Sequence, residues 1–171
     1  MPYVDLTDIK KIPLNGLEIL QLNPNTTLMK YTDLYQFDNI HDAFLGNKKL
    51  VLLYLLQNES MGHYVALFYN KNGLNYFDSY GVLPDYQFEL LTPAKRKQLH
   101  EEQDYLKQLI HNEPLIYNNI TYQDKGTATC GCFCSHRLHH KALDDNEYLE
   151  LFLKQNKTPD EVVSKWCFSK L

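Results

Sequence analysis

The sequence lacks any long hydrophobic run. Its longest apolar stretch, LVLLYLL at 50–56, is much shorter than the ~20 residues of a membrane helix and has the length of a buried β-strand. The opening segment MPYVDLTDIKK turns polar within a few residues, which is not typical of a secretory signal. We therefore expect no membrane partner and a reducing compartment, in which the cysteines stay thiols and triplets such as Asn25-Thr26-Thr27 carry no glycan.

A strong charge of one sign is also lacking. The net charge is −4, and acidic and basic residues are interspersed along the 171 residues. This argues against a broad electrostatic contact with DNA or RNA, so no specific nucleic-acid partner is predicted. The apolar content of 44% and the aromatic content of 13% are typical of a globular protein, and we expect residues 1–171 to form a single, monomeric domain.

Repeats, low-complexity tracts and interdomain linkers are absent as well, and the hydrophobic pattern predicts both strands and helices. The first 48 residues read as short helices and loops. Apolar or aromatic runs of strand length occur at 49–57, 63–70, 74–81 and 114–123. Helices are predicted to begin at Thr92-Pro93, Cys130, Asn146 and Thr158. The first of them carries an apolar stripe of Leu99, Leu106, Leu109 and Ile110. The predicted fold class is α+β, a small mixed β-sheet flanked by helices.

Motifs for metal or disulfide redox chemistry are lacking too. The stretch TATCGCFCSHRL at 127–138 places Cys130, Cys132 and Cys134 at every second position. Zinc ligands are usually paired across a turn, and redox cysteines usually form Cys-x-x-Cys. In a helix only Cys130 and Cys134 share a face, and the chain has no second ligand pair. We therefore predict no metal and no other cofactor. A zinc site that also uses the nearby histidines is the alternative.

Cys130 differs from the other cysteines in its expected position. It begins a helix directly after the turn-permissive run KGTAT, with Thr129 as the expected cap. The helix dipole lowers a thiol pKa at such a position and favours the nucleophilic thiolate. Gly131 follows and would let a substrate backbone approach closely. The other cysteines read as small buried residues, so Cys130 is the candidate nucleophile, which requires a base and a group that orients the base.

The candidate base and its orienting acid lie on a predicted hairpin. His63 begins the first strand, and Asp78 lies near the end of the second. A two-residue Asn-Gly turn would place Val82 opposite His63, whereas a four-residue loop over 70–73 would place Tyr80 there. In both registers His63 and Asp78 share a face, because the side-chain period of a strand is two. Such an acid fixes the tautomer of the histidine and supports the imidazolium; a structural histidine beside a chance aspartate is the alternative.

Gln123 stands seven residues before Cys130, at the end of a predicted strand. Its side-chain amide can donate a hydrogen bond to a developing oxyanion, together with the backbone N–H of Cys130. An ordinary exposed glutamine is the alternative. In chain order, His63, Asp78, Gln123 and Cys130 supply a base, an orienting acid, an oxyanion donor and a nucleophile.

This ordered set resembles the adenovirus-type processing cysteine proteases and, more distantly, the proteases of ubiquitin-like modifiers. The matching segments are GHYVALFYNKNGLNYFDSYG around His63 and Asp78, YQ at 122–123, and TCGCFC around Cys130. The spacing from Gln123 to Cys130 is similar to that of the adenovirus branch. The segments FDSYGVLPD, IYNNITYQDKGTATCG and YLELFLKQNKTPDEVVSKW resemble proteases of virophages, large DNA viruses and self-synthesising transposons. The resemblance runs from about residue 28 to the C-terminus.

The resemblance implies a papain-like convergent fold of the adenain type and a viral cysteine endopeptidase. Its implied substrates are capsid or other virion precursor proteins, cut after small, Gly-rich sites, and its implied location is the virion and the host-cell cytoplasm. The implied catalytic residues are Cys130, His63, Asp78 and Gln123, with Tyr64 and Gly131 contacting the substrate.

Three positions depart from the family pattern. Tyr64 replaces the tryptophan that usually follows the histidine and keeps an aromatic surface there. Asp78 stands where the adenovirus enzyme has glutamate, although the wider group uses aspartate. Cys132 is an additional cysteine without an assigned role. Stimulation by DNA and by a disulfide-linked peptide, a property of the adenovirus enzyme, is not carried over, because the net charge of −4 gives it no support.

Other functions fit the same residues. An isopeptidase that removes ubiquitin or a SUMO-like modifier would also cut after Gly-Gly. An acyltransferase with this triad would transfer acetyl groups to Ser, Thr or Lys. A catalytically inactive binding module, or a zinc-binding structural protein, would use none of this acyl chemistry.

Overall fold

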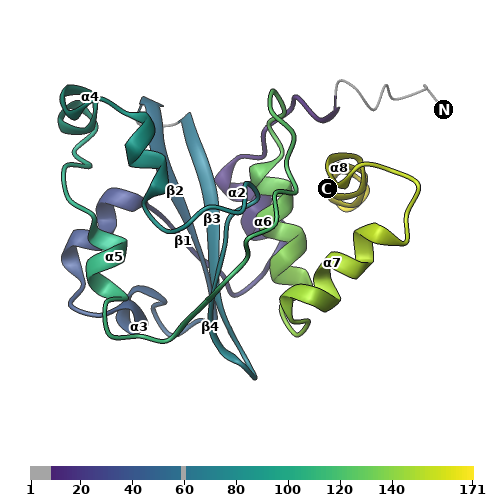
Figure 1. Cartoon of the computed structure of the whole chain (residues 1–171), viewed down its shortest axis with the longest axis horizontal. Coiled ribbons are helices and arrows are strands. Elements are labelled where there is room, and N and C mark those ends of the chain that lie inside the picture. Colours follow the sequence, from purple (N-terminus) through teal and green to yellow (C-terminus); the bar gives the residue numbers. More distant parts are fainter. Residues whose placement is uncertain (1–8, 59–60) are drawn as a thin grey trace.

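The computed structural model describes residues 9–58 and 61–171. Its centre is a five-stranded mixed sheet with the strands in sequence order. The strands are β1 (Thr27–Lys30), β2 (Lys49–Asn58), β3 (Met61–Asn70), β4 (Gly73–Phe77) and β5 (Leu115–Tyr117). The three middle strands are antiparallel, and the edge strands β1 and β5 pair in parallel with β2 and β4. Helices cover both faces of the sheet (Figure 1), so the predicted α+β class is confirmed.

Side chains of the central strands alternate between two hydrophobic cores, as a strand period of two requires. In β3, Val65 and Leu67 face one core, whereas Ala66 and Phe68 face the other. The run from Leu50 to Leu55 in β2 is buried throughout, which explains its continuous apolar sequence. In the part of the chain that the structure describes, no helix has both the length and the apolar character needed to cross a bilayer.

The layer on one side of the sheet consists of α2 (Gly16–Leu22), α6 (Cys130–His139), α7 (Asp145–Leu153) and α8 (Pro159–Phe168) (Figure 1). The central helix of this layer is α6, which packs against β3 and is covered by α2 and α8. It is buried from Gly131 to Leu138, so its sequence shows no amphipathic stripe. The predicted capping box at Thr158 and Glu161 begins α8.

The opposite layer consists of short helical segments, η1 (Tyr31–Gln36), α3 (Ile40–Ala43), η2 (Tyr86–Leu90), α4 (Pro93–Gln98) and α5 (Tyr105–Leu109). The prediction of one helix that carries an apolar stripe to Ile110 is wrong. The chain leaves the helical conformation after α4, with His100 at a φ of 60°. Leu99 therefore packs in a small cluster with Leu53, while Leu106 enters the core beneath this layer.

The β3–β4 hairpin closes at Lys71-Asn72, one residue before the expected Asn72-Gly73 turn, because Asn70 pairs with Gly73. This is the register of the four-residue-loop alternative, which would place Tyr80 opposite His63. The alternative register, with Val82 in that place, is wrong. The ladder ends at Phe77, so Asp78 lies just beyond β4. The predicted strand at 114–123 is likewise shortened to the three residues of β5.

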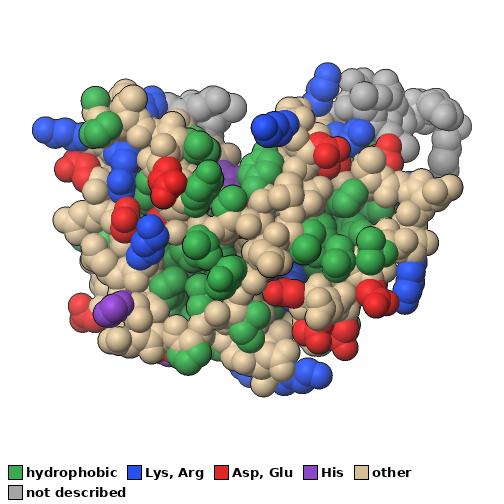
Figure 2. All heavy atoms as spheres, viewed as in Figure 1, with side chains coloured by type: hydrophobic (Ala, Val, Ile, Leu, Met, Phe, Trp, Pro, Cys, Tyr) green, Lys and Arg blue, Asp and Glu red, His purple; other side chains and the backbone are tan. Residues whose placement is uncertain are grey.

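Charged side chains of both signs are scattered over the face of the molecule drawn in Figure 2. Hydrophobic side chains gather between them in several patches. The interspersed charge of the sequence is therefore also interspersed on this surface, and no large patch of one sign is seen on it.

Candidate active site

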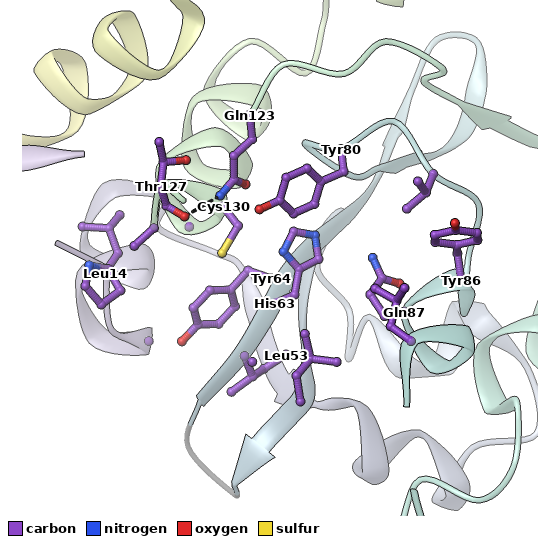
Figure 3. A pocket seen from close by; sticks show the side chains of 18 of the residues that line it. Leu14, Leu53, His63, Tyr64, Tyr80, Tyr86, Gln87, Gln123, Thr127 and Cys130 are labelled. Carbon is purple, nitrogen blue, oxygen red and sulfur yellow. Dashed lines mark hydrogen bonds between the residues drawn. The ribbon is translucent and has the colours of Figure 1, made fainter. Parts of the chain in front are cut away.

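The structure brings His63, Asp78, Gln123 and Cys130 together, as the sequence predicts. His63 lies near the start of β3, Asp78 directly follows the end of β4, and Cys130 is the first residue of α6. Because β3 and β4 are antiparallel, the start of one strand and the end of the other meet at the same end of the sheet. Figure 3 shows His63 and Gln123 on two sides of the Cys130 sulfur.

A close approach of backbones holds His63 in place. The residue before it, Gly62, lies in β3 opposite Leu55 of β2. A Cβ on Gly62 would lie 1.6 Å from the carbonyl oxygen of Tyr54, a separation that no side chain can adopt. Glycine is therefore required directly before the candidate base, because the two strands could not otherwise approach this closely.

His63 and Asp78 form a buried hydrogen-bonded pair. The His63 Nε2 atom lies 3.0 Å from Asp78 Oδ1, and the two residues are 5% and 0% exposed. Burial by itself would lower the pKa of His63, but the Asp78 carboxylate and the hydrogen bonds to Asp78 and Cys130 outweigh it and raise the pKa above its ordinary value. The pair therefore favours the imidazolium, and Nδ1 is the ring nitrogen left for the thiol.

The Cys130 thiol has a pKa below its ordinary value. Burial would raise this pKa, but the hydrogen bond and positive charge of His63 and the backbone N–H groups of Tyr64 and Gly131 lower it. Cys130 is also partly exposed, whereas the other three cysteines are buried. A thiolate with solvent access, next to an imidazolium and at a helix N-terminus, is the species that acts as a nucleophile.

Cys132 and Cys134 are in environments that keep their thiols protonated. A hydrogen bond shared with Cys167 and then burial raise the pKa of Cys132. Burial raises the pKa of Cys134. The Cys167 thiol donates to the backbone carbonyl of Cys132 at 3.8 Å. These side chains belong to the hydrophobic core on the α6 side of the sheet.

Three further groups hold the Asp78 residue, and the sequence alone did not indicate them. The Tyr80 backbone N–H donates to Asp78 Oδ1 at 2.8 Å. The Gln87 side-chain amide donates to Asp78 Oδ2. Asn118 brackets the Asp78 backbone, accepting from its N–H at 3.0 Å and donating to its carbonyl at 2.7 Å. The carboxylate is thus anchored by both oxygens, and only its Oδ1 atom faces His63.

Gln123 is buried beside Cys130, not exposed. Its Oε1 atom accepts from Ser79 Oγ at 2.7 Å, and its Nε2 atom donates to the Thr127 carbonyl at 3.1 Å. An amide nitrogen has two protons, so the second one can serve another acceptor. The fixed amide orientation is compatible with an oxyanion donor.

The loop before Cys130 is held by Asp160 at the start of α8. Its Oδ2 atom accepts from the Asp124 backbone N–H at 2.9 Å. Its Oδ1 atom accepts from Thr127 Oγ1 at 2.9 Å and from Thr129 Oγ1 at 2.5 Å. The prediction of Thr129 as a side-chain cap of α6 is therefore wrong, because its hydroxyl serves Asp160 and makes no capping bond.

A groove of about 1110 Å³ runs past His63 and Cys130. Its walls are mainly apolar and aromatic and include Leu14, Leu28, Leu53, Leu56, Val82 and Tyr86. Both residues predicted to contact substrate, Tyr64 and Gly131, line it. Gly131 also has a packing role, since a Cβ there would lie 3.1 Å from the Cβ of Leu14.

Among the described residues, no group of three or more His, Cys, Asp or Glu side chains is arranged to hold a metal ion.

No protein-family model matches the chain. It is similar to the uncharacterized protein V9 of Sputnik virophage, with 29% identity over 170 residues, covering 94% of this chain and 97% of that protein. Two solved structures from Chlamydia trachomatis are also similar. The effector protein Cdu1 bound to ubiquitin has 13% identity and a TM-score of 0.40, covering 95% of this chain and 81% of that chain. ChlaDub1 has 12% identity and a TM-score of 0.40, covering 99% and 81%.

Proposed function

We propose that this protein is a viral cysteine endopeptidase of the adenovirus-processing type. The observation that carries the proposal is the position of His63, whose ring lies between a buried carboxylate and a partly exposed thiol of lowered pKa. A histidine held in this way can store and return a proton, while the thiolate attacks a carbonyl carbon.

In the acylation step, the Cys130 thiolate forms a bond to the scissile carbonyl carbon, and the carbonyl oxygen becomes an oxyanion. The Cys130 backbone N–H and the free proton of the Gln123 amide stabilise this oxyanion. When the intermediate collapses, the C–N bond breaks and His63 gives its Nδ1 proton to the leaving amine. The products of this step are a thioester on Cys130 and a new N-terminus.

In the deacylation step, His63 is neutral and accepts a proton from water, which attacks the thioester carbon. The C–S bond breaks, the acid product leaves, and the thiolate–imidazolium pair forms again. Asp78 keeps its charge throughout and holds the ring in the orientation that both transfers need.

The proposed substrates are virion precursor proteins, cut after Gly-rich segments. Similarity to a virophage protein over nearly the whole chain supports a viral source. The groove of about 1110 Å³ that passes Cys130, with its mainly apolar walls, supports a polypeptide substrate.

Fluorogenic peptides with Gly-Gly or Gly-x-Gly before the cut, compared with matched peptides carrying leucine at the glycine positions, test this proposal. We expect hydrolysis of the glycine peptides only, lost in Cys130→Ala and kept in Cys134→Ala. Labelling of Cys130 by a ubiquitin or SUMO vinyl sulfone, without peptide or precursor cleavage, would favour an isopeptidase. Acetyl transfer in place of hydrolysis would favour the acyltransferase. The absence of both hydrolysis and acetyl transfer would contradict an acyl-transfer enzyme.

A further inference from the structure

Among the described residues, Gln87 is the side chain that donates a hydrogen bond to the outer oxygen of the Asp78 carboxylate. It lies on η2, is 4% exposed, and lines the groove beside His63 (Figure 3). Its Nε2 atom donates to Asp78 Oδ2 in a short hydrogen bond, while Oδ1 accepts from the Tyr80 backbone and lies 3.0 Å from His63.

The other atom of the Gln87 amide has no partner. Its Oε1 atom is buried and accepts no hydrogen bond. A carboxylate can only accept, so the amide must turn its nitrogen toward Asp78, and the oxygen is left unpaired. A buried polar atom without a partner destabilises the folded state. An apolar side chain of the same size would avoid this cost, so the amide is better explained by what its nitrogen does for Asp78.

The segment that carries Gln87 is fixed in the core. Asp85 precedes η2 with a φ of 64°, in the left-handed region. Its Oδ1 atom accepts from Tyr54 Oη at 2.7 Å, and its Oδ2 atom accepts from the Lys107 backbone N–H at 3.0 Å. The Tyr54 hydroxyl in turn lies 3.1 Å from the Asp85 backbone nitrogen. These bonds set the start of η2, and so the place from which the Gln87 side chain reaches Asp78.

We propose that Gln87 is a positioning residue of the triad, which acts through Asp78. Its amide prevents the carboxylate from rotating, so that Oδ1 stays on His63 and the thiolate–imidazolium pair is maintained. This inference rests on the proposed acyl-transfer function, because it assigns Gln87 a part in the same reaction.

Two substitutions test the inference. Gln87→Met keeps the length of the side chain, removes the donor, and also removes the unpaired Oε1 atom. We expect its kcat to fall about 10-fold at neutral pH, as for loss of one hydrogen bond to a charged group, with KM and melting temperature little changed. Gln98→Met, an exposed glutamine on α4, is the matched control and should leave kcat unchanged.

Gln87→Glu should make turnover depend on pH in a way that a loss of packing alone would not produce. At low pH the new carboxyl is protonated and can donate its O–H to Asp78, which restores the lost bond. As the pH rises it ionises and repels Asp78, since two carboxylates that share a site cannot both be charged at low cost. Turnover relative to the unchanged protein should therefore fall with rising pH in Gln87→Glu and show no such fall in Gln87→Met.

Alkylation of Cys130 by iodoacetamide separates this inference from the proposed function, because it requires no peptide cleavage. Slower alkylation in Gln87→Met, with the fold intact, supports the inference even if no peptide is cut. Turnover and alkylation within about 2-fold of the unchanged protein in both variants would overturn it. An equal loss in both variants at every pH, accompanied by a lower melting temperature, would also overturn it and assign Gln87 to the core.

Discussion

Cys130 and Cys134 lie one turn apart on the same helix, yet their surroundings give them opposite chemistry. Cys130 is partly exposed at the first position of α6, with His63 and two backbone N–H groups next to its sulfur. Cys134 is buried among apolar side chains of the core. The pKa of the first thiol lies below its ordinary value, and burial raises the pKa of the second.

The comparison shows that neither the residue type nor the helix makes a nucleophile. Both positions lie on one face of α6 and both are cysteines. What differs is access to solvent, the free amide groups at the helix start, and the imidazolium that Asp78 supports.

The largest effect is expected from exchanging each thiol for alanine. Cys130→Ala removes the nucleophile and should lower kcat/KM by at least about 10⁴-fold. Cys134→Ala should leave turnover nearly unchanged and lower the free energy of unfolding by roughly 1 kcal/mol, because it leaves a small cavity. Peptide hydrolysis and urea unfolding of both variants check this. Full activity of Cys130→Ala would contradict the role of Cys130 as the nucleophile.

His63→Ala should make Cys130 resemble Cys134. Without the imidazolium the pKa of the thiol rises, and no group protonates the leaving amine, so kcat should fall by at least about 10³-fold. The buried Asp78 carboxylate also loses a partner, which should lower stability. Hydrolysis rates and melting temperature are the measurements. A small loss of turnover at unchanged stability would contradict the assigned role of His63.

Gln123→Ala should leave the reactivity of both thiols unchanged and remove only a hydrogen bond that stabilises the transition state. We expect kcat to fall about 10²–10³-fold, with the alkylation rate of Cys130 unchanged. Gln123→Glu, which keeps the acceptor and loses the donor, is the matched variant and should be similarly impaired. If alkylation slows as much as hydrolysis does, Gln123 supports the loop and not the oxyanion.

The pH dependence should separate the two partners of the ion pair. Peptide hydrolysis should appear as the pH rises through the lowered pKa of Cys130 and decline as it passes the pKa of His63, raised to about 10. Because the folded-state pKa of His63 is raised, its contribution to stability is complete below its ordinary pKa and disappears as the pH rises through the raised value. A profile that begins only near the pKa of a free thiol would contradict the pair.

The parts of the site that the sequence predicts depend on local pattern. The period of two places His63 and Asp78 on one face whichever turn closes the hairpin. The helix start at Cys130 is similarly local, whereas the predicted strand end at Gln123 is wrong, because β5 ends at Tyr117. These four residues come together in the structure, although their catalytic roles stay predictions.

The parts that the sequence did not reveal depend on contacts between distant segments. Gln87 reaches Asp78 from a segment that begins at Asp85, which adopts a left-handed conformation. Tyr54 of β2, distant in the sequence, holds Asp85 in place through a hydrogen bond. The strand β1 pairs in parallel with β2 across a long connection, which no short pattern announces. The break after α4 follows from Leu99 and Leu106 entering different clusters. Thr129 had the right type for a cap, but Asp160 of α8 competes for its hydroxyl.

Site-resolved alkylation tests the central claim most directly. The purified protein would be titrated with iodoacetamide across pH, and the modification of each cysteine located by mass spectrometry. We predict rapid modification of Cys130 well below the pH at which a free thiol reacts, no comparable reaction at Cys132, Cys134 or Cys167, and a much slower reaction at Cys130 in His63→Ala. Slow and uniform labelling of all four cysteines, unaffected by His63→Ala, would contradict an activated Cys130–His63 pair.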